Sequence, residues 1–189
     1  MRKGLGLICA ISLLGVGVLA ATPAGSATAK GPTCKTFTAT VTDTPPLPKI
    51  GVTTFVTSKV VTTGKIGGCS GGPAAGVTGA TIKASYTYKG NCSTFAGLSK
   101  GSVTTPGPSV LTWTNGKTSN TTTTIKTLSK LGVYPLRLQL TTKVTKGQYA
   151  GTTTVGTVIG TAAQGKTACQ ASGLAKSFLN GVPGTFTFK

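Results

Sequence analysis

Residues 111–120 read LTWTNGKTSN and combine the only tryptophan of the chain with a glycine-containing turn. The Asn115-Gly116 pair favours a tight hairpin, because both residue types tolerate a positive φ. Two registers are open. A two-residue loop of Asn115-Gly116 pairs Thr114 with Lys117, whereas a three-residue loop that also includes Thr114 pairs Trp113 with Lys117.

The register decides whether Trp113 is a binding residue or a core residue. In the two-residue register, its indole ring and the ammonium of Lys117 form a candidate binding platform for a sugar or a phosphate. In the three-residue register, Leu111, Trp113 and Ile125 share one side of the sheet. Because register follows the buried face, we predict the three-residue loop, with Gly116 in a left-handed conformation and Trp113 mostly in the core.

Apolar and polar residues alternate in many segments outside this hairpin. Period-two patterns over residues 35–42, 80–89 and 135–144 predict half-buried antiparallel strands. Turn signals rich in Gly, Pro and Asn separate these segments, and Asp43 falls in a proline-rich stretch, TDTPPLP, that reads as a loop. Weaker patterns predict further strands at 51–62, 109–114, 118–128, 151–161 and 184–188.

The spacing of these strands predicts an all-β chain of about eight strands, folded as a single antiparallel β-sandwich or meander β-barrel. The order Cys92, Trp113, Cys169 is similar to the immunoglobulin pattern, but Thr167 stands where that fold has its corner tyrosine. An immunoglobulin-like sandwich is therefore a minor alternative. One segment departs from strand periodicity, since apolar residues at helical spacing predict a short helix near 172–180.

The first residues have the three regions of a signal peptide. Arg2–Lys3 is a positive start, Leu5–Ala21 is an apolar run, and Ala27–Ala29 has the small-x-small form of a cleavage site. A membrane anchor is the alternative, but the run is marginal in length for spanning a bilayer and is rich in Gly and Ala. We therefore expect cleavage near Ala29 and secretion, or retention at the cell surface, of a single β-domain of residues 30–189.

The cysteines agree with export. Of the five, one lies in the apolar run, and the others are Cys34, Cys69, Cys92 and Cys169. Four cysteines in an exported domain indicate two disulfides. In a meander, strands alternate in direction, so Cys34 and Cys69 reach one end and Cys92 and Cys169 the other. Because bridged Cα atoms lie within about 7 Å, we predict the disulfides Cys34–Cys69 and Cys92–Cys169.

The chain has almost no side chains that could act as a general acid or a general base. The chain has one acidic residue, Asp43, and no histidine. A glycosidase needs two carboxylates, a Ser-His-Asp triad needs a histidine, and calcium or magnesium sites need several oxygen ligands. The cysteines lack the paired spacing of zinc sites, and nothing marks a Ser–Lys pair, for instance with Lys100. We therefore expect no catalytic residue, no metal or cofactor site and no enzymatic activity.

The charge balance is strongly basic. The formal net charge is +18, and it falls to +16 if Arg2 and Lys3 leave with the signal. The lysines occur singly, and Arg137 is the one remaining arginine, so sequence-specific nucleic-acid binding is not expected. Two interpretations stay open. The lysines keep strand faces soluble and edges unpaired, or their diffuse charge attracts anionic cell-wall polymers or a membrane surface.

Taken together, these features resemble a group of small secreted, Thr/Gly-rich β-proteins of actinobacteria. The likeness rests on the signal ending in Ala-Thr-Ala, the Thr/Gly-rich strands, the corner LTWTNGKTS and the late segments TACQASGL and GTFTF. That group shares a W-[ST]-N-G-x-[TS] corner and a comparable cysteine pattern over most of residues 34–188. The resemblance implies export and a β-fold, and it assigns no activity and no functional residues.

The sequence thus predicts an exported, non-enzymatic β-domain that acts by binding or as a component of the cell envelope or extracellular space. It does not specify the ligand. The alternative is a cationic effector that binds the anionic surfaces of other cells through teichoic acid, anionic lipid or extracellular DNA. The two predictions differ in salt dependence, because attraction by diffuse charge is screened by salt.

Overall fold

Strands make up most of the structure. The computed structural model describes residues 31–93, 103–104, 107–129, 136–160, 169–181 and 186–189. Its strands are β1 (Thr33–Cys34), β2 (Thr36–Leu47), β3 (Val56–Gly67), β4 (Gly79–Gly90), β5 (Val103–Thr104), β6 (Ser109–Trp113), β7 (Thr118–Thr127), β8 (Leu136–Gly147), β9 (Thr153–Gly160), β10 (Leu174–Gly181) and β11 (Phe186–Thr187).

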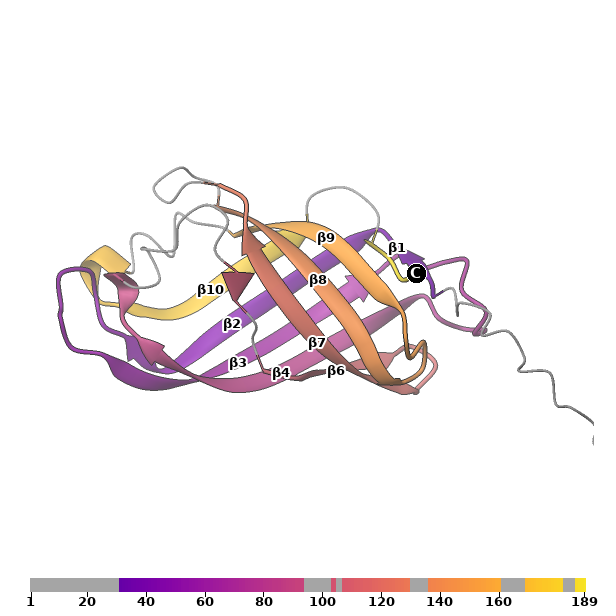
Figure 1. Cartoon of the computed structure of the whole chain (residues 1–189), viewed down its shortest axis with the longest axis horizontal. Helices are drawn as coiled ribbons and strands as arrows, with labels where there is room; N and C mark the ends of the chain where they lie inside the picture. Colours follow the sequence, from indigo (N-terminus) through magenta and orange to yellow (C-terminus); the bar gives the residue numbers. More distant parts are fainter. Residues whose placement is uncertain (1–30, 94–102, 105–106, 130–135, 161–168, 182–185) are drawn as a thin grey trace, which may run out of the picture.

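Eight of these strands form a closed antiparallel barrel (Figure 1). Their order around the barrel is β2, β3, β4, β6, β7, β8, β9 and β10, and β10 pairs back with β2. Apart from the two-residue β5, which pairs with β7, each barrel strand lies beside its neighbour in the chain. Of the two predicted architectures, the structure is therefore the meander barrel and not the sandwich.

The three strongest strand predictions are confirmed within β2, β4 and β8, and the weaker ones overlap β3, β6, β7, β9 and β11. The loop predicted around Asp43 is wrong, because β2 continues to Leu47. Pro45 and Pro46, which suggested a loop, lack an N–H donor for a ladder. They are tolerated because pairing of β2 with β3 ends at Thr44, and pairing with β10 is irregular beside them.

The helix predicted near 172–180 is also wrong. A single helical turn at 169–171 is followed by β10, which pairs with both β2 and β9 and closes the barrel. These hydrogen bonds to two neighbouring strands override the helical spacing of the apolar residues. Gly173 makes the entry into β10 with a φ of 97°, where its backbone passes so close to Leu47 that a Cβ would clash with the carbonyl oxygen.

Both predicted disulfides are confirmed, and they mark opposite ends of the barrel. Cys34–Cys69 ties the segment before β2 to the segment after β3, and Cys92–Cys169 ties the segment after β4 to the segment before β10. We name the ends the Cys34 end and the Cys92 end. Their agreement with the prediction follows from the alternating strand directions of a meander.

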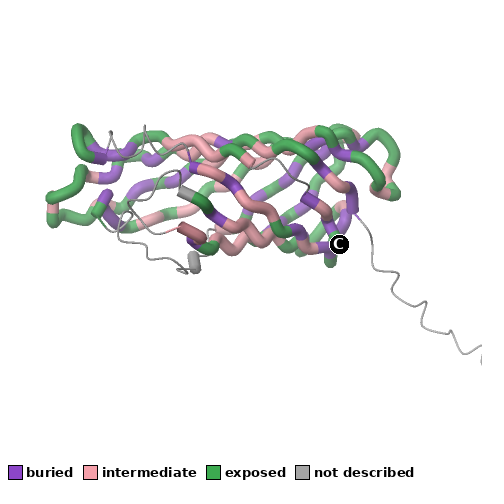
Figure 2. Tube along the Cα trace, turned by 90° about the horizontal axis from the view of Figure 1, so that it is seen from above, coloured by how far each residue is buried: buried purple, intermediate pink, exposed green. Residues whose placement is uncertain are grey.

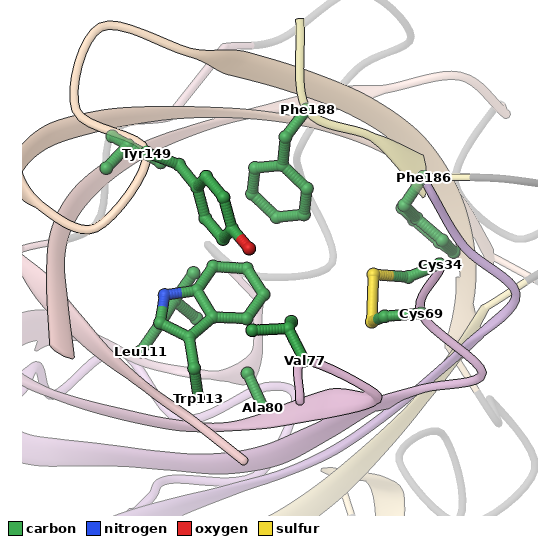
Figure 3. Close-up of a cluster of buried hydrophobic side chains, with 10 residues drawn as sticks. Cys34, Cys69, Val77, Ala80, Leu111, Trp113, Tyr149, Phe186 and Phe188 are labelled. Carbon is green, nitrogen blue, oxygen red and sulfur yellow. A yellow bond between two sulfur atoms is a disulfide. The ribbon is translucent and has the colours of Figure 1, made fainter. Parts of the chain in front are cut away.

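An aromatic cluster fills the Cys34 end (Figure 3). The ring of Trp113 lies edge-on to Tyr149, with centroids 5.0 Å apart, and to Phe188, with centroids 5.4 Å apart. Phe188 is held in place because the last residue, Lys189, exchanges two backbone hydrogen bonds with Thr153 at the start of β9. The C-terminal segment therefore closes this end from inside.

A second, smaller cluster lies at the Cys92 end. It joins the bridge Cys92–Cys169 with Leu47 and Leu174, and Val56 and Tyr88 pack against it. Along the strands between the two ends, buried and exposed residues alternate (Figure 2). The barrel therefore has an inward face along its whole length, with packed clusters at both ends.

Replacing Phe188 by alanine should strongly destabilise the barrel. The side chain is 1% exposed, and truncating a buried phenylalanine costs about 3–5 kcal/mol through lost burial and a cavity. Denaturant unfolding with the disulfides intact measures the change in the free energy of unfolding. Val155→Ala is the control, because Val155 is 50% exposed and its truncation should cost less than about 0.5 kcal/mol. Equal effects of the two variants would contradict a role of Phe188 in closing the Cys34 end.

Candidate binding site inside the barrel

The predicted three-residue turn is confirmed. The N–H of Trp113 donates to the carbonyl of Lys117 at 2.8 Å, and the N–H of Gly116 donates back to the carbonyl of Trp113 at 2.9 Å. Gly116 has a φ of 80°, the left-handed conformation expected for this loop. Leu111 and Trp113 are accordingly buried on the inward face.

The alternative binding platform of Trp113 and Lys117 is therefore excluded. Trp113 is 2% exposed, and its indole N–H donates to the hydroxyl of Ser119 at 2.8 Å, so neither its ring nor its donor is available to a ligand. Lys117 is exposed. The turn that resembled a binding site is a structural corner, in which the tryptophan supplies core area and satisfies its one polar atom internally.

The interior of the barrel contains a better candidate. Between the two end clusters lies a cavity of about 120 Å³. Because each water occupies roughly 30 Å³ in the liquid, the cavity has room for about four waters or one small organic molecule. Most of its wall is apolar, and Leu111, Phe186 and Phe188 of the aromatic cluster form part of it. Other large apolar side chains in the wall are Phe37, Ile66, Ile82, Ile125, Leu140 and Leu179.

The cavity exists because several inward positions carry small residues. Ala84 on β4 and Ser109 on β6 line it, where larger side chains would fill the middle of an eight-stranded barrel. Gly156 on β9 has a different role. A Cβ there would lie 1.7 Å from the ring of Phe186, so the glycine lets this aromatic ring enter the barrel. Small residues therefore leave space in the middle and admit large ones at the Cys34 end.

The polar groups of the wall are hydroxyls, and two pairs satisfy each other. The hydroxyls of Ser109 and Thr121 are 2.6 Å apart, and those of Thr123 and Thr142 are 2.9 Å apart. The hydroxyl of Thr154, also in the wall, is buried without a hydrogen-bond partner in the described part of the chain. The lining contains no lysine, arginine, asparagine or glutamine among the described residues. The wall is thus neutral and only weakly polar.

Asp43 lies on the inward face of β2, at the side of the cavity nearer the Cys92 end. It follows Ala39 and Val41 at the same parity, and Val41 lines the cavity. Across the sheet, Asp43 is paired with Val60 on β3, which is paired with Tyr86 on β4. Tyr86 lines the cavity, whereas Asp43 is not itself a lining residue. The only side-chain carboxyl of the chain therefore lies beside the cavity wall, one inward position beyond Val41.

Burial changes the protonation of this carboxyl. Asp43 is 7% exposed, and desolvation raises its pKa from the ordinary 3.8 to about 6, because a low-dielectric interior disfavours the charged form. The pKa of Tyr86 is also raised, first by its own desolvation and then by the negative charge of Asp43. A carboxyl of this kind can hold a cation, accept a hydrogen bond or exchange a proton near neutral pH.

The outer face carries the opposite charge. Every lysine and arginine in the described part of the chain is exposed, including Lys59, Lys83, Lys143 and Lys176 on four different strands. Among the same residues, no three His, Cys, Asp or Glu side chains form a group that could hold a metal ion. The described molecule therefore separates its charges, with the acid inside and the bases outside.

The sequence analysis did not identify Asp43 or the cavity as parts of a site. For Asp43, the sequence does contain a pattern that indicates its inward position. The alternation Phe37, Ala39, Val41 continues to Asp43 at the same parity, which places the carboxyl on the inward face once the strand is extended. The proline pair that follows masked this signal. No sequence pattern indicates the cavity, because its wall is formed by side chains from strands that are far apart in the sequence.

Comparisons with protein-family models, with curated proteins and with solved structures found no match. The site is therefore interpreted from its own geometry and chemistry.

Replacing Asp43 by asparagine should stabilise the protein at neutral pH. Between about pH 4 and pH 6 the folded protein keeps a proton that the unfolded chain has lost, so the stability of the wild type falls as pH rises through this window. Solvent screening of the carboxyl reduces the free energy that corresponds to this change in pKa to about 1–2 kcal/mol. We expect Asp43→Asn to unfold with a free energy about 1–2 kcal/mol higher than the wild type above pH 7 and similar to it near pH 4.

Denaturant unfolding across this pH range tests that expectation. Thr42→Asn is the matched control, because Thr42 is adjacent and exposed, and it should leave the pH profile of the wild type unchanged. Parallel pH profiles for the wild type and Asp43→Asn would show that the carboxyl is not buried as described.

Proposed function

We propose that this protein is an exported, non-enzymatic barrel that binds one small, mostly apolar molecule in its interior. The observation that carries the proposal is the cavity of about 120 Å³ between two packed ends. Small eight-stranded barrels either fill their interior with side chains or hold one ligand there. A concave, mostly apolar space with a few convergent polar groups is the usual form of a small-molecule site.

Export is part of this proposal. The N-terminal segment has the order of charges, apolar run and small residues of a signal peptide. The disulfides at both ends are the kind of crosslink that persists in oxidising compartments. A disulfide-tied barrel suits a carrier or receptor for small molecules outside the cell, because the scaffold withstands conditions there without a cofactor.

A matched pair of variants on β4 tests binding in the interior. Isobutanol is a suitable probe, since it is small, neutral and largely apolar, and calorimetry should show one binding site. Ala84→Leu should weaken binding by at least about tenfold, because the added atoms occupy the cavity. Lys83→Leu adds apolar bulk on the exposed face and should leave the affinity within about twofold. Absence of binding, or equal effects of the two variants, would refute an interior site.

A second candidate function is supported by the outer surface. With every described basic side chain exposed and the one acidic side chain inside, the described exterior carries basic side chains and no acidic ones. Such a surface attracts teichoic acid, anionic lipid or extracellular DNA through diffuse charge. None of the helices in the described residues has the length and hydrophobicity of a transmembrane segment.

Salt dependence tests this second candidate. The protein should bind vesicles that contain phosphatidylglycerol at low ionic strength and lose most of that binding near physiological ionic strength, where the Debye length is about 8 Å. Vesicles of phosphatidylcholine alone are the control and should retain nothing. Ala84→Leu should behave as the wild type, because its change is internal. No retention on anionic vesicles even at low salt would refute the effector function.

A further inference from the structure

We infer that the molecule held in the barrel is a small amine, whose ammonium group is bound by Asp43 while its apolar part fills the cavity. This inference rests on the proposed function, since it requires that the cavity is a binding site. It specifies the chemical class of the ligand and the residue that selects it.

The first step is the position of the carboxyl group. Asp43 is on the inward face of β2, two residues beyond Val41 in the cavity wall. Tyr86 also lines the cavity, and the negative charge of Asp43 contributes to the raised pKa of Tyr86. An ammonium beside Asp43 would therefore leave the rest of its molecule directed along the apolar wall, away from the Cys92 end.

The second step is that no described residue pairs with the carboxylate. In the described part of the chain, no hydrogen bond or ion pair to Asp43 offsets its burial, and desolvation is the sole cause of its raised pKa. A buried carboxylate is costly unless it is paired. Lysines are abundant on the same strands, yet Lys59 on β3 and Lys176 on β10 are exposed. The cation that completes the site is thus absent from the strands beside it.

The third step concerns the sign of the charge on the ligand. Nothing in the described lining can neutralise an anionic ligand, because it contains neither lysine nor arginine. The hydroxyl pairs Ser109–Thr121 and Thr123–Thr142 already satisfy each other. An anion would enter a space whose nearest charge is negative, whereas an ammonium would gain a charge-assisted hydrogen bond. A neutral ligand would gain only the apolar contacts.

The positive charge of the exterior does not prevent the binding of a cationic ligand at physiological ionic strength. The lysines point into solvent, where their field is screened within about 8 Å. The carboxylate is buried, and an interaction at contact distance in the interior is screened much less. The exterior should slow the approach of a cation at low salt, while the affinity is set by the contact inside.

Cavity size limits the ligand to few atoms. Space for about four waters suits an apolar group of about four carbons with one nitrogen. Isobutylamine has this size, and isobutanol is nearly isosteric with it but uncharged. The pair differs mainly in the group that would contact Asp43.

Calorimetric titration of the wild type and Asp43→Asn with these two probes tests the inference. At about pH 7.5 the wild type should bind the amine at least about tenfold more tightly than the alcohol, a typical gain for a buried charge-assisted hydrogen bond. Asp43→Asn should bind both within about twofold of each other. Since removal of the buried charge stabilises the fold, this variant is expected to remain folded.

Proton linkage gives an independent measurement on the wild type. Because the pKa of Asp43 is about 6, lowering the pH to about 5 should weaken amine binding by roughly tenfold and leave alcohol binding unchanged. Tyr86, the titratable group on the neighbouring inward position of β4, has a raised pKa and stays neutral over this range. Lys59 and Lys176 on the flanking strands are exposed to solvent.

The outcomes separate the inference from the proposed function. If the amine and the alcohol bind the wild type equally and Ala84→Leu weakens both, the interior site stands and the role of Asp43 is refuted. If the amine prefers the wild type but Asp43→Asn and low pH do not reduce that preference, the ammonium binds elsewhere and the inference is refuted. If neither probe binds, the proposed function fails and the inference fails with it.

Discussion

The structure depends on the pairing of β10 with β2, which closes the sheet into a barrel. Without this ladder, β2 and β10 would each expose unpaired backbone groups along one edge. Closure also gives every strand one inward and one outward face, so that the period of two in the sequence becomes a separation of interior from exterior. The buried position of Asp43 and the outward lysines both follow from that closure.

The volume inside the closed sheet is the second constraint. An eight-stranded barrel has room for inward side chains and little else. Here the aromatic residues gather at the Cys34 end, where Phe186 lies over Gly156 and Phe188 packs against Trp113. Smaller residues such as Ala84 occupy the middle. The cavity is therefore the consequence of concentrating large side chains at the ends, each of which is also tied by a disulfide.

The sequence predicted most features that depend on local pattern. Strand alternation located β2, β4 and β8, the glycine-containing turn fixed the register of Trp113, and the alternating directions of a meander gave both disulfides. The failures involve information that is not local. The apolar residues of 174–181 fit a helix or a strand, and only pairing with β2 and β9 decides between them. The cavity depends in the same way on residues that meet across the barrel.

Asp43 is difficult to explain by stability or solubility. An acid that served solubility would be exposed, and one that served stability would have a cation or several N–H donors beside it. Asp43 has neither exposure nor such a partner in the described part of the chain, and its burial lowers stability at neutral pH. A buried and costly carboxyl beside a cavity is the feature expected of a binding residue, because sites are where local rules of stability are broken. The interior and the cationic exterior use separate groups, so a ligand inside and an anionic surface outside could be bound by one barrel without competition.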